Sequence, residues 1–330
     1  MTTQAAAPMR IPRPCHFLMC PPTYFDVRYA INPWMDPGDP PDRRVAMEQW
    51  ERLRALLVDL GHRVELAEPE PGLPDMVFAA NAATVVDDRI LVSSFRHPER
   101  RGETAAYERW FRARGYRQVR RAGRTNEGQG DHLLAGGRLL AGHGFRTERE
   151  SHPETGGFLR RDVVELTLVD ARFYHLDTAF AVLAEDTVMY WPGAFSAAGR
   201  RRLAALFPDA LLVEEADAAA FGLNAVSDGR NVLLPSGAAA LADRLRGRGF
   251  EPHLVDAGEL MKAGGGPKCC VLHLHHASAT PWERRPNGHG NQRLHPAPAG
   301  SARSGLGPAA ATAAPDARAD FRVDRPDRAA

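Results

Sequence analysis

A short segment in the middle of the chain places an imidazole and a carboxylate two residues apart. Residues 174–180 read YHLDTAF, so His175 and Asp177 are separated by a single leucine. If the segment is an extended strand, the period of two directs both side chains to one face. An imidazole can transfer a proton near neutral pH, and a carboxylate is a fixed anion. The pair is suited to hold and protonate a cationic substrate; a buried structural histidine with an ion-paired aspartate is the alternative interpretation.

Two adjacent cysteines, Cys269 and Cys270, supply a candidate nucleophile. They follow the sequence GGGPK, in which glycines let the backbone approach a ligand closely and Lys268 can favour the reactive thiolate. If residues 268–274 form a strand, the two thiols face opposite ways, so only one of them can reach a site. A thiolate with a distant histidine makes a nucleophile and base pair, whereas two buried core cysteines are the alternative.

The same region permits a metal interpretation. Cys269, His273 and His275 share strand parity, and thiolate and imidazole are ligands that suit zinc. The sequence contains no second Cys/His pair at finger-like spacing. We therefore expect no bound metal.

Two carboxylates and two arginines complete the set of candidate side chains. Glu127 and Asp131 flank the glycine-containing sequence GQG, and with Asp177 they offer the negative charge that a cationic group needs. Arg100, in the sequence HPER, and Arg146, in the sequence GFRT, are candidates to bind a substrate carboxylate bidentately. A solvated turn and two surface arginines are the alternative interpretation.

A repeat with a period of 45 to 50 residues would position these side chains. It is marked by one polar residue near the start of each copy, at Asn81, Asp131, Asp177, Asn224 and Cys269. The copies read as strand, strand, helix and strand, and we expect helices at 43–60, 102–114, 152–161, 197–206 and 238–248. Such a period predicts radial repetition that brings one polar residue from each copy into a central cavity. A doubly wound sheet with coincidental spacing is the alternative.

The two ends of the repeat are expected to meet. The fifth copy starts with KCCVLHL at 268–274, and we expect it to close with the N-terminal strand at 16–20. Residues 23–42 are aromatic and then Pro-rich without a clear period, and we interpret them as an ordered functional loop.

Composition narrows the class of protein. The 330 residues are 44% hydrophobic and 25% charged, with a net charge of +1, which gives no basic excess for nucleic acid or an anionic membrane. We find no apolar run near the ~20 residues that span a bilayer and no secretory signal. With four cysteines, a cytoplasmic protein with free thiols is expected.

The composition also suggests domain boundaries. We expect a flexible N-terminus at 1–14 and a single catalytic domain at 15–275. Residues 276–330 are rich in Pro, Ala, Gly and Arg without apolar periodicity, which predicts a disordered tail.

Taken together, the motifs resemble a known group of enzymes. The segments MCPPTYFDVRYAINPWMD, DMVFAANA, HPERRGE, NEGQGD, GFRTERESH, RFYHLDTAF and GGGPKCC occur in this order. They resemble the guanidine-modifying enzyme superfamily, also called the pentein or amidinotransferase-like fold, over about residues 15–274. The resemblance implies an α/β propeller of five units, in agreement with the repeat.

The resemblance also implies roles for the candidate residues. Cys269 would attack the guanidinium carbon, and His175 would protonate the leaving amine and then activate water. Asp177 and Glu127 would hold the guanidinium and orient the histidine. The implied substrate-binding positions are Asn32, Asn81, Arg100, Arg146, Asp177 and Ala263. The implied partner is a small guanidino compound, with no metal or organic cofactor.

The residue at position 81 indicates which enzymes of the superfamily the chain resembles most. Deiminases and dimethylarginine dimethylaminohydrolases usually carry Asp where this chain has Asn81, and the Asn form with the INPW loop looks most like arginine dihydrolases. An amide can both donate to and accept from a ligand, so it could tolerate neutral citrulline. Ala79, Ala83 and the paired cysteine depart from the dihydrolase pattern. We expect hydrolysis of L-arginine to ammonia and ornithine or citrulline; the alternatives are a dimethylarginine hydrolase, an amidinotransferase and a non-catalytic binding homologue.

Overall fold

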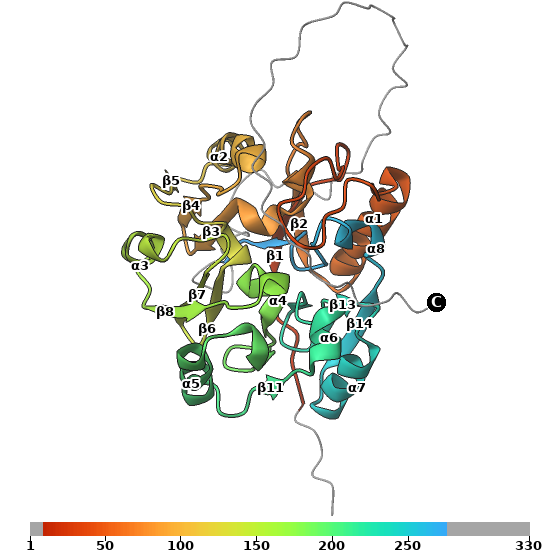
Figure 1. The fold of residues 1–330 in the computed structure, drawn as a ribbon, viewed down its shortest axis with the longest axis vertical. Coiled ribbons are helices and arrows are strands. Elements are labelled where there is room, and N and C mark those ends of the chain that lie inside the picture. Colours follow the sequence, from red (N-terminus) through yellow and green to blue (C-terminus); the bar gives the residue numbers. More distant parts are fainter. Residues whose placement is uncertain (1–8, 276–330) are drawn as a thin grey trace, which may run out of the picture. The chain divides into compact units, whose positions relative to one another are not determined.

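Five small sheets surround a common centre (Figure 1). The structure is a computed structural model that describes residues 9–275, so the predicted tail at 276–330 and the first eight residues lie outside the described residues. Each sheet has three strands, and the sheet orders are β3-β4-β5, β6-β7-β8, β9-β10-β11, β12-β13-β14 and β15-β1-β2. This arrangement confirms the predicted five-unit α/β propeller.

Every sheet has the same internal topology. The first strand runs antiparallel to the second, and the second runs parallel to the third. The strands of the first four units are β3 (Ala83–Val86), β4 (Arg89–Val92), β5 (Gln118–Arg121), β6 (His132–Ala135), β7 (Arg138–His143), β8 (Val163–Thr167), β9 (Phe180–Val182), β10 (Val188–Tyr190), β11 (Leu211–Leu212), β12 (Val226–Ser227), β13 (Asn231–Pro235) and β14 (Glu251–Val255).

The fifth sheet closes the ring with both ends of the described chain. β15 (Leu272–His273) pairs antiparallel with β1 (His16–Met19), and β1 pairs parallel with β2 (Arg63–Leu66). The expected closure by the N-terminal strand is therefore confirmed.

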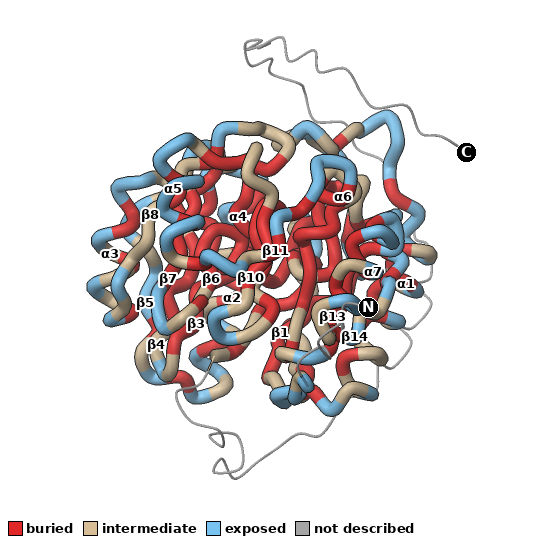
Figure 2. The backbone as a smooth tube through the Cα atoms, turned by 90° about the horizontal axis from the view of Figure 1, so that it is seen from below, coloured by how far each residue is buried: buried red, intermediate tan, exposed pale blue. Residues whose placement is uncertain are grey.

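One helix connects the two parallel strands of each unit, because parallel neighbours need a long crossover connection. These helices are α1 (Arg43–Asp59), α2 (Arg101–Ala113), α3 (His152–Leu159), α5 (Ala197–Leu206) and α7 (Ala239–Gly247). All five agree with the predicted ranges to within two residues at each end. They lie at the periphery, and buried backbone is concentrated toward the centre (Figures 1 and 2).

The first helix shows why these ranges fold as they do. Its N-cap is Asp42, whose carboxylate accepts hydrogen bonds from the backbone N–H groups of Arg44 and Val45. Trp50, Leu53 and Leu57 are fully buried on one face, as helical spacing requires.

A short turn precedes the first strand of each unit, and this was not predicted. The marker residues Asn81, Asp131, Asp177, Asn224 and Cys269 lie in these turns, one to three residues before the strand. The turns are η2 (Ala79–Ala82), η4 (Gly128–Gly130) with its C-cap, α4 (Leu176–Ala179), and the turns at 221–224 and 267–270. Two expectations are consequently wrong. His175 and Asp177 do not share a strand face, because His175 caps α4, and Cys269 lies in a turn.

The remaining short helices of residues 9–275 lie in connections: α6 (Glu215–Ala219), α8 (Gly258–Met261), η1 (Pro74–Val77), η3 (Pro98–Arg100), η5 (Arg149–Ser151), η6 (Ala171–Phe173) and η7 (Pro192–Ala194). None of the helices within residues 9–275 has the length and apolar character needed to cross a bilayer. Residues 23–42 contain no helix or strand, as expected.

A cluster of histidines lies at the contact between the β3 and β6 sheets. The Nδ1 atom of His132 is 2.7 Å from Thr84 Oγ1, and the rings of His132 and His152 are 6.4 Å apart. The His132 side chain is buried. Burial lowers the pKa of His132 to about 3, and neighbouring His152 lowers it further in the same direction. His132 is therefore neutral in the folded protein at neutral pH.

This burial predicts sensitivity of the fold to acid. The unfolded chain, with a histidine pKa of about 6.5, binds more protons than the folded chain between pH 6.5 and 3, so stability must fall as the pH is lowered through this range. For His132 alone, the free energy of unfolding should decrease by about 2 kcal/mol from pH 7 to pH 5. Urea unfolding of the wild type and His132→Gln at both pH values measures this. The variant should lose about 2 kcal/mol less on acidification, and equal losses would refute the assignment.

Candidate active site

The turns that precede the first strands pack against one another at the centre. The backbone N–H of Ala80 donates to the carbonyl of Cys269 at 3.0 Å. A Cβ atom added to Gly130 would lie 2.3 Å from Asn81 Nδ2 and 3.2 Å from His175 Cγ. Only glycine fits at this position, because any side chain would separate these two polar groups. The fold thus brings polar residues from different units into direct contact.

His175 is held by an ion-paired glutamate. Its Nε2 atom is 2.9 Å from Glu127 Oε2, and the same oxygen accepts a hydrogen bond from Arg146 Nη1 at 2.8 Å. All three side chains are buried. Burial alone would raise the pKa of Glu127, but Arg146 and the His175 hydrogen bond hold it well below its usual range. Glu127 is therefore an anion that fixes the orientation of the imidazole.

Asp131 secures the segment that carries His175. One carboxylate oxygen accepts the backbone N–H of Leu176 at 3.0 Å, and the other accepts the hydroxyl of Thr147 at 2.7 Å. Oδ2 of Asp131 also lies 3.9 Å from His175 Nε2. Burial raises the pKa of Asp131 to about 6, against the opposing effect of His175. Asp131 thus holds His175 in place both through the backbone of Leu176 and through its proximity to the imidazole.

Cys269 contacts Asp177 and Asn224. Its Sγ atom donates to Asp177 Oδ2 at 3.4 Å and accepts from Asn224 Nδ2 at 3.1 Å. Burial, and next the Asp177 carboxylate, raise the pKa of the Cys269 thiol well above its usual value. The expectation that Lys268 favours the thiolate is therefore not met, and Lys268 Nζ donates to the carbonyl of Val271 at 3.2 Å.

Asp177 retains an unused acceptor. Burial raises its pKa to about 6, and Lys268 opposes this shift. Within residues 9–275, no donor hydrogen-bonds to its Oδ1 atom, although that atom is buried. A buried carboxylate oxygen without a donor is costly, so this oxygen is suited to receive a ligand N–H group.

Cys270 differs from its neighbour in its hydrogen bonds. Both cysteines belong to one apolar cluster, and burial raises the pKa of the Cys270 thiol, but within residues 9–275 the Cys270 sulfur makes no hydrogen bond. Cys269, by contrast, is hydrogen-bonded to polar groups on two other units. Of the two thiols, the structure directs Cys269 toward the candidate site.

Arg100 differs most from its expected role. Its Nε and Nη2 atoms bind Glu103 at 2.8 and 2.9 Å, and its Nη1 atom donates to Asn81 Oδ1 at 2.9 Å. Nη2 also reaches the carbonyl of Asp75 at 3.3 Å. Because these donors are satisfied inside the protein, the arrangement does not fit a guanidinium that waits for a substrate carboxylate. Arg100 instead fixes the Asn81 amide. The Nδ2 atom of Asn81 is left to face the carbonyl of Glu127 at 3.5 Å.

Arg146, Asn32 and Ala263 lie where residues 23–42 meet the site. Arg146 Nη2 donates to the carbonyl of Ile31 at 2.9 Å, and Asn32 Nδ2 donates to the carbonyl of Ala263 at 3.1 Å. The Tyr174 ring lies 4.7 Å from the Arg146 guanidinium carbon. Residues 23–42 are thus tied directly to the group that neutralises Glu127.

The sequence interpretation missed several polar residues of this centre. Asp75 is buried, its Oδ2 atom accepts from the Tyr29 hydroxyl at 2.9 Å, and its Oδ1 atom has no donor within residues 9–275. Burial raises the pKa of Asp75, and Arg100 opposes this. Glu103 and Tyr174 were also not singled out. Asp75 and Glu103 lie in the motifs DMVFAANA and HPERRGE, and their place in these motifs could have indicated them as candidate site residues.

The centre carries more acid than base. The buried carboxylates are Asp75, Glu103, Glu127, Asp131 and Asp177, and the buried guanidiniums are Arg100 and Arg146. Such a site favours a cationic ligand. Residues 9–275 contain no group of three His, Cys, Asp or Glu side chains placed to hold a metal ion.

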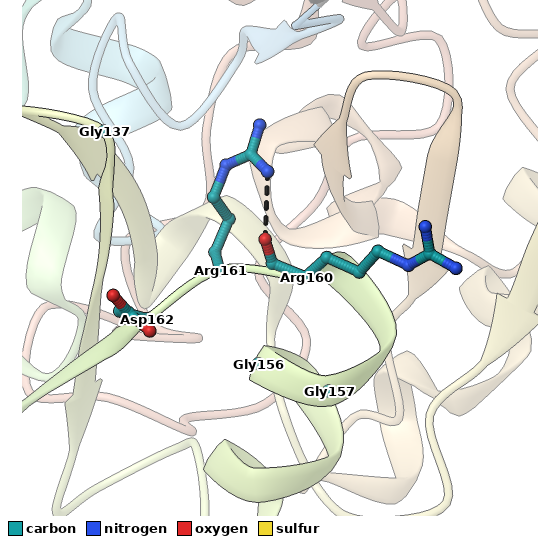
Figure 3. A pocket seen from close by; sticks show the side chains of 6 residues that line it. All are labelled: Gly137, Gly156, Gly157, Arg160, Arg161 and Asp162. Carbon is teal, nitrogen blue, oxygen red and sulfur yellow. Dashed lines mark hydrogen bonds between the residues drawn. The ribbon is translucent and has the colours of Figure 1, made fainter.

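A hollow elsewhere on the surface shares no residue with this centre. It is lined by Gly137, Gly156, Gly157, Arg160, Arg161 and Asp162, beside α3 (Figure 3). The Arg161 side chain turns back to the carbonyl of Arg160, and it also pairs with Asp87. We therefore assign the function to the polar centre and not to this hollow.

Comparison with known proteins places the chain among enzymes of guanidino compounds. It is 53% identical over 266 residues to an N(G),N(G)-dimethylarginine dimethylaminohydrolase of Mycobacterium tuberculosis, covering 81% of this chain and 88% of that protein. It is 40% identical over 264 residues to the bifunctional arginine dihydrolase/ornithine cyclodeaminase AgrE of Nostoc sp.. The second match covers 78% of this chain but only 37% of AgrE, so the chain spans about a third of that relative. No family model matches the chain.

Solved structures agree with these relatives. The N-terminal domain of ArgZ, a cyanobacterial arginine dihydrolase bound to its substrate, has a TM-score of 0.76 and 37% identity, with 79% of this chain and 98% of that chain covered. AgrE in complex with L-arginine has a TM-score of 0.77 and 39% identity over 79% of this chain and 40% of that chain. With its five-unit fold and the 53% identical relative, the chain belongs to the dimethylarginine dimethylaminohydrolase and arginine dihydrolase family of the guanidine-modifying superfamily.

Proposed function

We propose that the protein hydrolyses a guanidinium C–N bond of L-arginine, or of a close analogue, through a covalent intermediate on Cys269. The observation that carries the proposal is the buried contact of the Cys269 thiol with Asp177, whose second oxygen lacks a donor within residues 9–275. A planar cation with several N–H groups matches this acceptor. The products are ammonia and citrulline after one hydrolysis, or ornithine, ammonia and carbon dioxide after two.

Recognition relies on the excess of carboxylates. Asp177 receives guanidinium N–H groups on its unused oxygen, and Glu127 contributes negative charge beside His175. We assign the amino-acid end of the substrate to the region of Arg146, Asn32 and the Ala263 carbonyl, where residues 23–42 close over the centre. Because these side chains are buried or half-buried and tied to that segment, the segment must open to admit the substrate.

The geometry supports a reaction in two stages, in which each proton that His175 accepts is later returned. A bound cation offsets the Asp177 charge and favours the thiolate, and His175 accepts the thiol proton. The sulfur forms a bond to the guanidinium carbon, and His175 returns the proton to the departing nitrogen as the C–N bond breaks. His175 then deprotonates a water that attacks the same carbon. The C–S bond breaks, the sulfur leaves as a thiolate, and the proton that His175 took from water returns to it, which restores the thiol and the neutral imidazole.

The fixed amide of Asn81 favours a second round on the citrulline-level product. Arg100 can only donate, so the Asn81 atom that it contacts is the oxygen, and Nδ2 faces the interior. A donor at this position suits the ureido oxygen of citrulline better than the N–H groups of a guanidinium. We therefore favour ornithine as the final product.

A second candidate is the hydrolysis of dimethylarginine to citrulline and dimethylamine. It is supported by the name of the 53% identical relative from Mycobacterium tuberculosis. The same nucleophile, acid and carboxylates would serve it, and only the leaving group differs.

Product analysis distinguishes the candidates. We expect purified protein to convert arginine to ammonia and ornithine, with citrulline also consumed; mass spectrometry after incubation with arginine, citrulline or dimethylarginine measures this. Cys269→Ala should abolish turnover, whereas Cys270→Ala should keep most of it, because the contacts with Asp177 and Asn224 are made by the Cys269 sulfur. Release of dimethylamine alone would select the second candidate. Turnover by Cys269→Ala would overturn the proposed mechanism.

The pH dependence of kcat/KM tests the role of Asp177. Its pKa of about 6 means that the carboxylate is protonated below pH 6, and a neutral acid cannot hold the guanidinium charge. We expect kcat/KM to fall about tenfold per pH unit below pH 6, and more steeply where Asp131, with a similar pKa, also protonates.

His132→Gln is a suitable control for this pH profile, because His132 lies outside the proposed machinery and should leave the acid limb unchanged. An acid limb near pH 4 would contradict the assignment, since that is the range of an unperturbed carboxylate.

A further inference from the structure

Asn224 lies between the nucleophile and the acid that faces it. It is fully buried and is one of the five marker residues of the repeat, yet neither the sequence motifs nor the proposed mechanism uses it. Its Oδ1 atom accepts the backbone N–H of Cys269 at 3.1 Å. Its Nδ2 atom donates to Cys269 Sγ at 3.1 Å and to the carbonyl of Asp177 at 3.2 Å.

These contacts determine which way the amide points. A backbone N–H can only donate, so the Asn224 atom beside it is the oxygen. A carbonyl can only accept, so the atom beside the Asp177 carbonyl is the nitrogen. The two hydrogens of Nδ2 are thus directed at the Asp177 carbonyl and at the sulfur, and the sulfur receives a donor whatever its protonation state.

One backbone group near the sulfur acts in the same direction as Asn224, because a hydrogen bond from the Gly266 backbone also lowers the pKa of the Cys269 thiol. The Asp177 carboxylate accepts a hydrogen bond from the thiol and opposes a negative charge on the sulfur, while the Lys268 ammonium is directed at the carbonyl of Val271. Among the described residues, Asn224 is the only side chain with a hydrogen bond donated to Cys269 Sγ. A donor to an anionic acceptor is roughly twice as strong as one to a neutral acceptor, so its effect grows as the thiolate forms.

We propose that Asn224 is a catalytic residue that stabilises the Cys269 thiolate through Nδ2, both when the sulfur attacks and when it departs. This inference rests on the proposed function. Asn224 exchanges no proton in either stage: His175 takes the thiol proton and returns it to the leaving nitrogen, and the hydrogen bond to sulfur weakens while the S–C bond exists. It strengthens again when that bond breaks.

The test compares Asn224→Ala and Asn224→Asp with the wild type. The aspartate variant is nearly isosteric, but its carboxylate cannot donate and adds negative charge beside the sulfur. Two quantities are measured: kcat and KM on whichever of arginine, citrulline and dimethylarginine the wild type uses best, and the rate of Cys269 alkylation by iodoacetamide at pH 8, followed by peptide mass spectrometry.

We expect kcat to fall about 10²-fold to 10³-fold in both variants, the range seen when one donor to a developing anion is removed. KM should change less than about threefold, and alkylation should slow about tenfold, as one unit of thiol pKa implies. Folding is checked by circular dichroism, and the aspartate variant decides the matter if the alanine variant does not fold.

Asn231→Ala is the matched control. Asn231 is a buried asparagine of the same unit, but its Nδ2 atom donates to Asp228 and it is not hydrogen-bonded to Cys269. Its loss should reduce stability while kcat and alkylation stay within twofold of the wild type. Unchanged alkylation in a folded Asn224 variant would overturn the inference. If the wild type turns over none of the three substrates, the proposed function fails, and the alkylation rates still decide the role of Asn224.

Discussion

The contact between the Cys269 thiol and the Asp177 carboxylate is the constraint on which this centre depends. Burial raises the pKa of the Cys269 thiol, and the neighbouring Asp177 carboxylate raises it further, so the sulfur is a neutral thiol at neutral pH. In the proposed mechanism, a bound cation offsets the Asp177 charge and lets the thiol ionise. The charge of the proposed substrate would then activate the sulfur that attacks it.

A second set of interactions joins residues 23–42 to the carboxylate that holds His175. Glu127 is buried and kept ionised by Arg146, which also binds the carbonyl of Ile31 in residues 23–42. One guanidinium therefore joins the covering segment to the carboxylate that orients His175. A displaced segment would leave the Glu127 charge less compensated, so closure of the site and alignment of the imidazole are physically linked.

The fold could be predicted from the sequence because one structural unit occurs five times. The period of the marker residues and the amphipathic spacing around Trp50 report on local structure, and the five helices, the five sheets and the closing strand followed from them. The sequence did not predict the backbone conformation of the turns that connect the units. YHLDTAF alternates like a strand, yet its first half caps and forms α4, because the backbone N–H of Leu176 is bound by Asp131, 45 residues earlier in the chain.

The hydrogen-bond partners of the Arg100 side chain could not be predicted from the sequence either. Its sequence context allowed a free guanidinium, whereas the fold surrounds it with Glu103 and Asn81 from the same unit. The cost of burying an arginine is offset only by such partners. Pairing within a fold is a tertiary property, and no spacing rule in the sequence reports that Asn81, 19 residues away, would be within reach.

The five marker residues show how one repeated position acquires different chemistry. Each lies in the turn before the first strand of its unit, and Asp177, Asn224 and Cys269 are hydrogen-bonded to one another. Identical side chains would be unstable there, since five carboxylates would repel one another and five amides would leave no nucleophile. The chain instead carries an amide at Asn81 that is fixed by Arg100, and at Asp131 an acid that binds the backbone of Leu176. Asp177 accepts from the Cys269 thiol, while Asn224 donates to its sulfur and accepts its backbone N–H. Pseudosymmetry supplies the convergence, and departure from symmetry at these positions supplies side chains of different chemistry.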